Sequence, residues 1–258
     1  MLSLPDHPDV VFGKAPLVAV RCEATFSPVL ALMTQAGIAG LQEAVRSHYP
    51  IYEEKQRATF TFKNEIGLEH RPPVHCLSSG DGWSVNVTTT SVELRSDGAT
   101  YTTSADFLGR FESIANAVAR TISPEPTVRL LLAKENQLTH PDVDKPADWN
   151  GLLSASIVGP YVQLDGLTSD SGKPHGASMF HVHGDDQILE VKYGSTLAAP
   201  DRFDLSISRW TERPYDLEST QEVIDALQQF ADDATGIFHL LLEEPMKTYL
   251  EPNERAQA

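Results

Sequence analysis

The stretch from Trp83 to Leu138 constrains the fold more than any other part of the chain. Its apolar residues first alternate at period two over Trp83–Ser96, which is typical of a half-buried strand, with a bulge or a tight turn at Thr90-Ser91. They then recur at helical spacing over Ser104–Ile122, at the start of which Thr103 and Asp106 form a capping pattern, and return to strand period over Thr127–Leu138. The order strand, helix, strand predicts mixed α and β structure.

The rest of the chain follows the same two periodicities. Ser27-Pro28 is an N-terminal helix signal, Tyr49-Pro50 ends that helical stretch, and Ser219–Glu222 is a capping box before a long apolar helix face that Pro245 ends. A polar loop is expected over 63–73, closed by Pro72-Pro73. Further strands are predicted at Leu17–Phe26, Tyr52–Phe62, Val74–Ser79, Tyr161–Asp165, Ser178–His183, Ile188–Tyr193 and Phe203–Trp210, and a short helix at Trp149–Ile157.

These elements predict an α+β protein with antiparallel sheet, helices packed on it and a long C-terminal helix. The order of elements repeats, so the chain is expected to contain two diverged β-α-β-β-β-α halves. Residues 139–149 are rich in Asp and Pro and are the best candidate for a linker. We therefore expect an N-terminal half over 1–140, a C-terminal half over 141–250 and a disordered tail over 251–258.

The charge balance argues against two classes of partner. The chain of 258 residues carries 36 acidic and 20 basic side chains, which gives a formal net charge of −16. Nucleic acid and anionic membrane surfaces are both bound through a cationic surface. We therefore expect neither as a partner. A protein partner, with a homo-oligomer as a further option, fits an acidic, well-solvated surface better.

The cysteines and the apolar runs indicate the compartment. Cys22 and Cys76 are too few for a disulfide framework and too far apart for a metal-binding CxxC pair. No apolar run approaches the roughly 18 residues of a membrane-spanning helix. The first residues lack the basic and apolar regions of a secretory signal peptide. These features favour a cytoplasmic protein.

Several segments together resemble a family of sporadically distributed, mostly uncharacterised bacterial proteins of similar length. The strand from Phe12 to Phe26 resembles the opening strand of that family, and Trp83 through Phe107 resembles its strand–helix core. Val128–Asn136 is similar to an Arg-rich strand of the family, although Leu131–Lys134 replace part of the pattern, including an Arg-Tyr pair. Phe238–Leu250 resembles its closing helix.

This resemblance spans nearly the whole chain, but it brings no catalytic residue with it. It implies an accessory role in bacteria, for example in a defence system or a toxin–antitoxin system, with a partner encoded in the same operon. We expect such a protein to act through protein–protein contacts and not as an enzyme, so neither a catalytic residue nor a cofactor is expected on this hypothesis.

One short motif keeps a second hypothesis open. His181 and His183 lie two residues apart on a predicted strand, so their side chains share one face about 7 Å apart at Cα. Asp185 follows at the expected turn. Two imidazoles with a nearby carboxylate suit a divalent transition metal. The alternative function is therefore a metal-dependent enzyme or a small-ligand binder centred on His181, His183 and Asp185.

Other chemistry has little support in the sequence. The chain contains no Gly-x-Ser-x-Gly nucleophile elbow, no phosphate-binding P-loop and no GxGxxG dinucleotide motif. A third hypothesis comes from the long final helix, since such a helix can cap a curved sheet and enclose a small-molecule pocket in a helix-grip arrangement.

Overall fold

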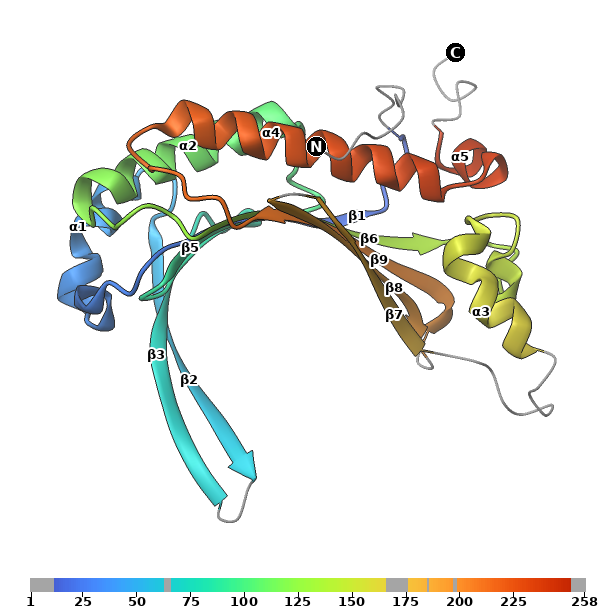
Figure 1. Ribbon diagram of the computed structural model, residues 1–258, viewed down its shortest axis with the longest axis horizontal. Helices are drawn as coiled ribbons and strands as arrows, with labels where there is room; N and C mark the ends of the chain where they lie inside the picture. Colours follow the sequence, from blue (N-terminus) through green and yellow to red (C-terminus); the bar gives the residue numbers. More distant parts are fainter. Residues whose placement is uncertain (1–11, 63–65, 166–175, 185, 197–198, 252–258) are drawn as a thin grey trace. The chain divides into compact units, whose positions relative to one another are not determined.

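The computed structural model describes residues 12–62, 66–165, 176–184, 186–196 and 199–251 (Figure 1). The protein is α+β, and its nine strands form one sheet in the order β2-β3-β4-β5-β1-β6-β9-β8-β7. The strands are β1 (Leu17–Thr25), β2 (Ile51–Phe62), β3 (Ile66–Ser78), β4 (Trp83–Val87), β5 (Ser91–Asp97), β6 (Arg129–Thr139), β7 (Gly176–His183), β8 (Gln187–Thr196) and β9 (Ala199–Thr211). The α-helices are α1 (Gln35–Val45), α2 (Ser104–Thr121), α3 (Ala155–Asp165), α4 (Thr220–Leu241) and α5 (Glu244–Leu250), with 3₁₀ turns at Leu30–Met33 and Pro146–Trp149.

The stretch that begins at Trp83 forms a hairpin and not one long strand. β4 and β5 pair antiparallel, with Val87 opposite Val92. The backbone amide of Thr88 donates to the carbonyl of Ser91 at 2.9 Å, which closes a tight turn. Of the two alternatives for the break at Thr90-Ser91, a bulge or a tight turn, the structure therefore shows the tight turn.

The prediction of a loop before Val74 is wrong over the described residues 66–73. They belong to β3, which pairs with β2 along its length, while residues 63–65 lie outside the described part of the chain. The register shifts between Lys55 and Arg57, at the point where Pro72-Pro73 faces the partner strand. Proline lacks the amide that a ladder needs, so it is tolerated in a strand at such an irregularity.

Two predicted element boundaries also differ from the structure. The helix expected from Ser27 begins instead at α1, where the side chain of Thr34 accepts a hydrogen bond from the Gly37 amide. The helix expected at Trp149–Ile157 and the strand expected at Tyr161–Asp165 are replaced by the single helix α3. Buried Ile157, Val158 and Tyr161 share one helical face, so packing favours the helix although Pro160 lies within it.

The chain divides into two compact units. Unit 1 contains residues 1–19, 133–209 and 230–258, and unit 2 contains residues 20–132 and 210–229. The predicted division into residues 1–140 and 141–250 stays a prediction. From β6 onward the order β6-α3-β7-β8-β9-α4 is β-α-β-β-β-α, although β6 itself lies within the predicted N-terminal half, and the elements before β6 include one strand more because β4 and β5 are separate.

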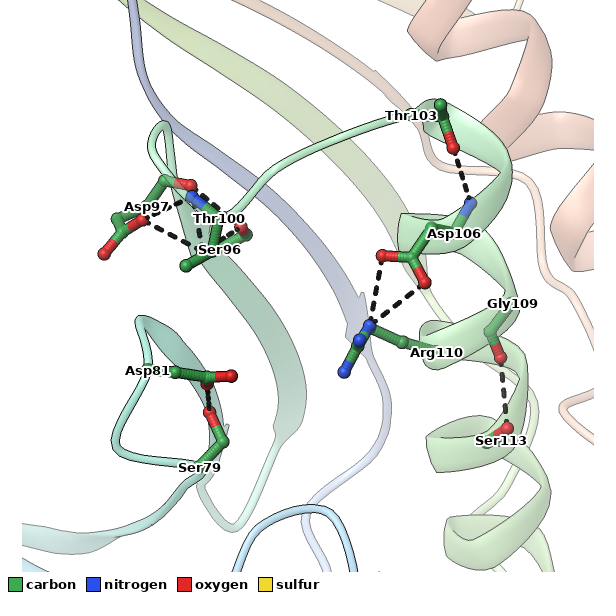
Figure 2. Close-up of polar contacts among 10 residues, drawn as sticks. All are labelled: Ser79, Asp81, Ser96, Asp97, Thr100, Thr103, Asp106, Gly109, Arg110 and Ser113. Atoms are coloured by element: carbon green, nitrogen blue, oxygen red, sulfur yellow. Dashed lines mark hydrogen bonds and ion pairs between the residues drawn. The ribbon is translucent and has the colours of Figure 1, made fainter.

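Unit 2 has its core between the strands β1, β3, β4 and β5 and the helices α1 and α2. The ring of Trp83 on β4 lies 5.9 Å from that of Phe107 on α2. Figure 2 shows how α2 begins: the Thr103 hydroxyl accepts from the Asp106 amide at 3.1 Å, the capping interaction that the sequence predicts. The Asp106 carboxylate in turn accepts a hydrogen bond from Arg110, which lies one helical turn further along α2.

Unit 1 has a core of its own, to which strands and helices contribute. Its members come from β6, β8 and β9, from α3 and α5, and from the second part of α4. Rings pack at its centre, with Phe203 stacked on Tyr193 at 6.2 Å and tilted against Trp149 at 5.7 Å. Among the described residues, no helix is long and apolar enough to cross a membrane.

Candidate functional site

One face of the unit 1 strands points away from that core, and we call it the open face. Side chains alternate along a strand, so those next to the buried Val191, Phe203 and Leu205 point to the opposite side. No helix of the described part of unit 1 covers this side of the strands (Figure 1). The open face is formed by Glu135 of β6, Ala177, Met179, His181 and His183 of β7, Glu190, Lys192 and Gly194 of β8, and Asp204 and Ser206 of β9.

The predicted site residue His181 takes part in an ionic network on this face. It lies opposite Glu190 in the β7–β8 hairpin, and its Nε2 is 2.9 Å from Glu190 Oε2. The other carboxylate oxygen of Glu190 lies 2.7 Å from Lys192 Nζ. Burial alone would raise the pKa of Glu190, but the hydrogen bonds from Lys192 and His181 outweigh it and lower that pKa. Glu190 is therefore held as a carboxylate between two donors.

The second predicted residue, His183, lies close to the first. The ring centroids of His181 and His183 are 5.9 Å apart with their planes nearly perpendicular, as expected for two residues on one face of a strand. Asp185, the third predicted ligand, lies outside the described residues. Within the described part of the chain, no group of three or more His, Cys, Asp or Glu side chains is arranged to hold a metal ion.

A pocket of about 530 Å³ opens on the same face. Ligand pockets commonly have volumes of about 300–1,000 Å³. Its lining is mostly apolar, and Gly194 is required there: a Cβ at this position would lie 2.4 Å from the carbonyl oxygen of Gly176 and 2.8 Å from Cα of Ala177. The close approach of β7 to β8 thus depends on a residue without a side chain. The pocket is lined by Val18, Glu135, Asn136, Gly176, Ala177, Lys192, Tyr193, Gly194, Ser195, Asp204, Leu205 and Ser206.

Charged and apolar side chains alternate around this pocket. Asp204 accepts from Gln137 at 3.3 Å and pairs with Arg202 at 3.2 Å. Val18, which lines the pocket, is 42% exposed, and Met179 of the open face is 54% exposed. An apolar hollow with a charged margin can bind an apolar group and fix its orientation.

A tyrosine from the core side fixes the end of β7 next to the pocket. The Tyr161 hydroxyl of α3 donates to the Gly176 carbonyl at 2.7 Å and accepts from the Ser195 amide at 3.3 Å. Burial raises the pKa of Tyr161, which keeps the hydroxyl protonated and able to donate. The hairpin that carries His181 and Gly194 is thus anchored at its base.

Unit 2 has a hollow of similar volume, about 540 Å³, between α1 and α2. Arg110 lines this hollow and forms an ion pair with Asp106 at 3.2 Å (Figure 2). Its guanidinium also lies 4.2 Å from the centre of the Trp83 ring. Gly109 and Ser113 continue the same wall of the hollow, where the Ser113 hydroxyl donates to the Gly109 carbonyl. These contacts already engage the Arg110 guanidinium, so this hollow is a weaker candidate for a binding site than the open face.

The two histidines could be predicted from the sequence, but the residues that surround them could not. Glu190, Lys192 and Asp204 were not among the predicted ligands, because they come from other strands. One signal was present: His181 and Glu190 are placed symmetrically about the predicted turn at Gly184–Asp186, and an antiparallel hairpin places such residues opposite each other.

The fold and the site define an α+β protein with a pocket on a sheet face that no described helix of unit 1 covers. Comparison with known proteins does not assign this protein to a family. No protein-family model matches the chain, and no curated protein matches it. Among solved structures, the di-domain ARO/CYC StfQ from the steffimycin biosynthetic pathway aligns with 93% of this chain and 100% of its own, at 10% identity and a TM-score of 0.17. A similarity this weak supports no inference.

Proposed function

We propose that this protein is a non-catalytic binding protein, and that its open face holds an apolar segment of a partner protein. The observation that carries the proposal is the pocket of about 530 Å³, which is lined in part by the exposed side chain of Val18. Apolar anchors that fill a pocket commonly provide most of the energy of a protein interface. The charges of Glu135, Lys192 and Asp204 at the margin would set its orientation and specificity.

The edge strand β7 adds a second contact surface beside the pocket. It is the last strand in the order of the sheet, and seven of its eight residues are exposed. An extended segment of a partner could pair with such an edge while a side chain enters the pocket. The resemblance to bacterial accessory proteins makes a partner encoded in the same operon, in a defence or toxin–antitoxin setting, the first one to test.

Co-expression with each neighbouring gene product, followed by size-exclusion chromatography and a measured Kd, tests this function. We expect one stable complex and expect Ser206→Arg, which places a long charged side chain in the pocket, to weaken it at least tenfold. Ser113→Arg is the matched control, because it makes the same substitution on α2 in unit 2 and not in the pocket of unit 1. Absence of any complex contradicts the function, and equal binding by both variants contradicts its placement on the open face.

A metal site is the second candidate, and the paired imidazoles favour it. His181 and His183 could hold a divalent transition metal, and Glu190 would become a third ligand only after a rearrangement, since the described residues hold no ready group of three. Glu190 would have to give up its 2.7 Å contact with Lys192, so Lys192 competes with the metal. Metal bound at this place would make the open face a small-ligand or catalytic site.

Metal analysis of the purified protein, with a zinc titration, tests this candidate. Stoichiometric metal that disappears in the double variant His181→Ala/His183→Ala supports it. The double variant His48→Ala/His140→Ala is the control, since it removes two imidazoles elsewhere in the chain. A metal content that is low in the native protein and unchanged by the first double variant removes the metal hypothesis.

A further inference from the structure

Lys134 of β6 extends its amine beneath the helix α4. Its Nζ donates to the Thr235 hydroxyl at 2.6 Å and to the Ala231 carbonyl at 3.1 Å. The Thr235 hydroxyl in turn donates to the same carbonyl at 2.8 Å. Both acceptors of the amine are neutral oxygens. Lys192 and Lys247 differ, because each of them lies within 3 Å of a glutamate carboxylate.

A small pocket of about 120 Å³ lies beside this amine. At about 30 Å³ per molecule of liquid water, it has the volume of about four waters, or of a carbonyl compound with three or four carbons. Aromatic rings form one wall: Phe12 stacks on His239 at 5.1 Å and meets Phe238 edge-on at 6.1 Å. The pocket is lined by Phe12, Ala15, Pro16, Leu17, Lys134, Asn136, Ala234, Thr235, Phe238 and His239.

The surroundings favour the neutral form of the amine. Burial lowers the pKa of Lys134 from 10.5 to about 8, and the carboxylate of Asp232 on α4 offsets only part of that effect. The other titratable side chain that lines this pocket is His239, also on α4. At pH 7.5 the fraction of neutral amine at Lys134 is on the order of 100 times that of an ordinary lysine. The neutral amine is the nucleophilic form.

From this geometry we propose that Lys134 captures a small aldehyde or ketone in the pocket as an imine. The amine lone pair forms a bond to the carbonyl carbon as the C=O π electrons move to the oxygen, and one proton passes from the nitrogen to that oxygen. The resulting carbinolamine loses its oxygen as water and its nitrogen loses a proton, which leaves a C=N bond. One carbonyl compound and one amine give one imine and one water, so no oxidant or reductant is needed. Apolar Phe12 and Phe238 would contact the alkyl part of the ligand.

A purely structural lysine would use the same two hydrogen bonds, so the test has to report on reactivity. The full chain is incubated with propanal and sodium cyanoborohydride, which reduces an imine to a stable secondary amine. Peptide mapping by mass spectrometry then gives a labelling rate for each lysine. At pH 7.5 we expect Lys134 to react at least about tenfold faster than Lys192 and Lys247, with a rate that levels off above about pH 8.

Two variants separate capture in the pocket from general amine reactivity. Ala15 is exposed and lines the pocket, so Ala15→Phe should fill it without disturbing the core and should slow labelling of Lys134 at least about fivefold. Lys134→Arg keeps the charge and should remove this label alone. The proposal is overturned if Lys134 reacts no faster than Lys192, or if Ala15→Phe leaves its rate unchanged.

Discussion

His181 and Glu190 face each other across the β7–β8 hairpin, with Nε2 of the imidazole 2.9 Å from Oε2 of the carboxylate. Lys192 reaches the other oxygen of the same carboxylate from the next position on that face of β8. One carboxylate thus ties two strands together beside the pocket of the open face. The pair also explains why the metal hypothesis depends on Glu190, since a metal at His181 would meet this carboxylate first.

Replacement of Glu190 by Gln should destabilise the protein in a pH-dependent way. Because the folded pKa of Glu190 lies below its ordinary value of 4.5, its contribution is complete above pH 4.5 and is lost as the pH falls through the folded value. Lys192 is half exposed, so solvent screening limits the effect at pH 7 to about 1 kcal/mol.

Urea unfolding of both proteins between pH 7 and pH 3.5 measures this difference. Glu244→Gln is the control, since Glu244 pairs with Lys247 on the surface of α5 and its loss should stay within about 0.5 kcal/mol. A difference for Glu190→Gln that grows as the pH falls would contradict the assignment of Glu190 as the stabilising carboxylate.

Two glycine substitutions should have opposite effects. Gly194→Ala places a Cβ 2.4 Å from the carbonyl oxygen of Gly176, so β7 must move, at a cost of about 2 kcal/mol. Gly109 lies within α2 and a Cβ there meets nothing within 4 Å, so Gly109→Ala should stabilise by roughly 0.5–1 kcal/mol. Thermal unfolding of the two variants measures both effects. Equal stability of Gly194→Ala and the native protein would show that the pocket wall is not fixed by this close approach.

The sequence predicted those parts of the fold that local periodicity determines. Alternation located β1, β2 and β8, and the hydroxyl of Thr103 marked the start of α2, because these features depend on neighbours along the chain. α3 was missed, since the residues around Tyr161 fit either period and packing in the core decides for the helix.

The candidate site was harder to predict because it depends on pairing between strands. His181 and His183 could be found from their spacing, but Glu190 becomes their neighbour only through the register of the hairpin. Alternation along β6 places Lys134 on the same face as Leu130 and Leu132. Its burial also needs α4 above it, and no local pattern specifies where that helix packs.

His75 of unit 2 should be held in one orientation by a hydrogen bond at each ring nitrogen. Its Nε2 lies 2.8 Å from the Leu32 carbonyl oxygen, which can only accept, so Nε2 carries the hydrogen. Nδ1 forms a hydrogen bond with the Tyr52 hydroxyl at 3.0 Å. Tyr52→Phe removes that hydrogen bond and should cost about 1 kcal/mol, whereas His75→Leu also leaves the buried carbonyl unpaired and should cost about 2–3 kcal/mol. Urea unfolding ranks the two variants, and the reverse order would contradict this arrangement.

The buried amine of Lys134 should make stability rise with pH in the alkaline range. Its pKa is about 8 in the folded protein and 10.5 in the unfolded chain, so between these values the unfolded state binds more protons. Stability therefore increases as the pH rises from 8 to 10.5, by at most roughly 3 kcal/mol for this group. The variant Lys134→Met lacks this amine, so it should not show this rise in stability.

The difference in unfolding free energy between the native protein and Lys134→Met reports the contribution of this lysine alone, because both proteins contain the same other groups that titrate at alkaline pH. We expect the free energy of unfolding of the native protein to rise relative to that of Lys134→Met between pH 8 and pH 10.5. Lys192→Met, which removes a half-exposed lysine, is the control, and its difference should not rise over that range. A flat difference for Lys134→Met would mean that the amine is not desolvated, and the imine chemistry proposed for Lys134 would lose its physical basis.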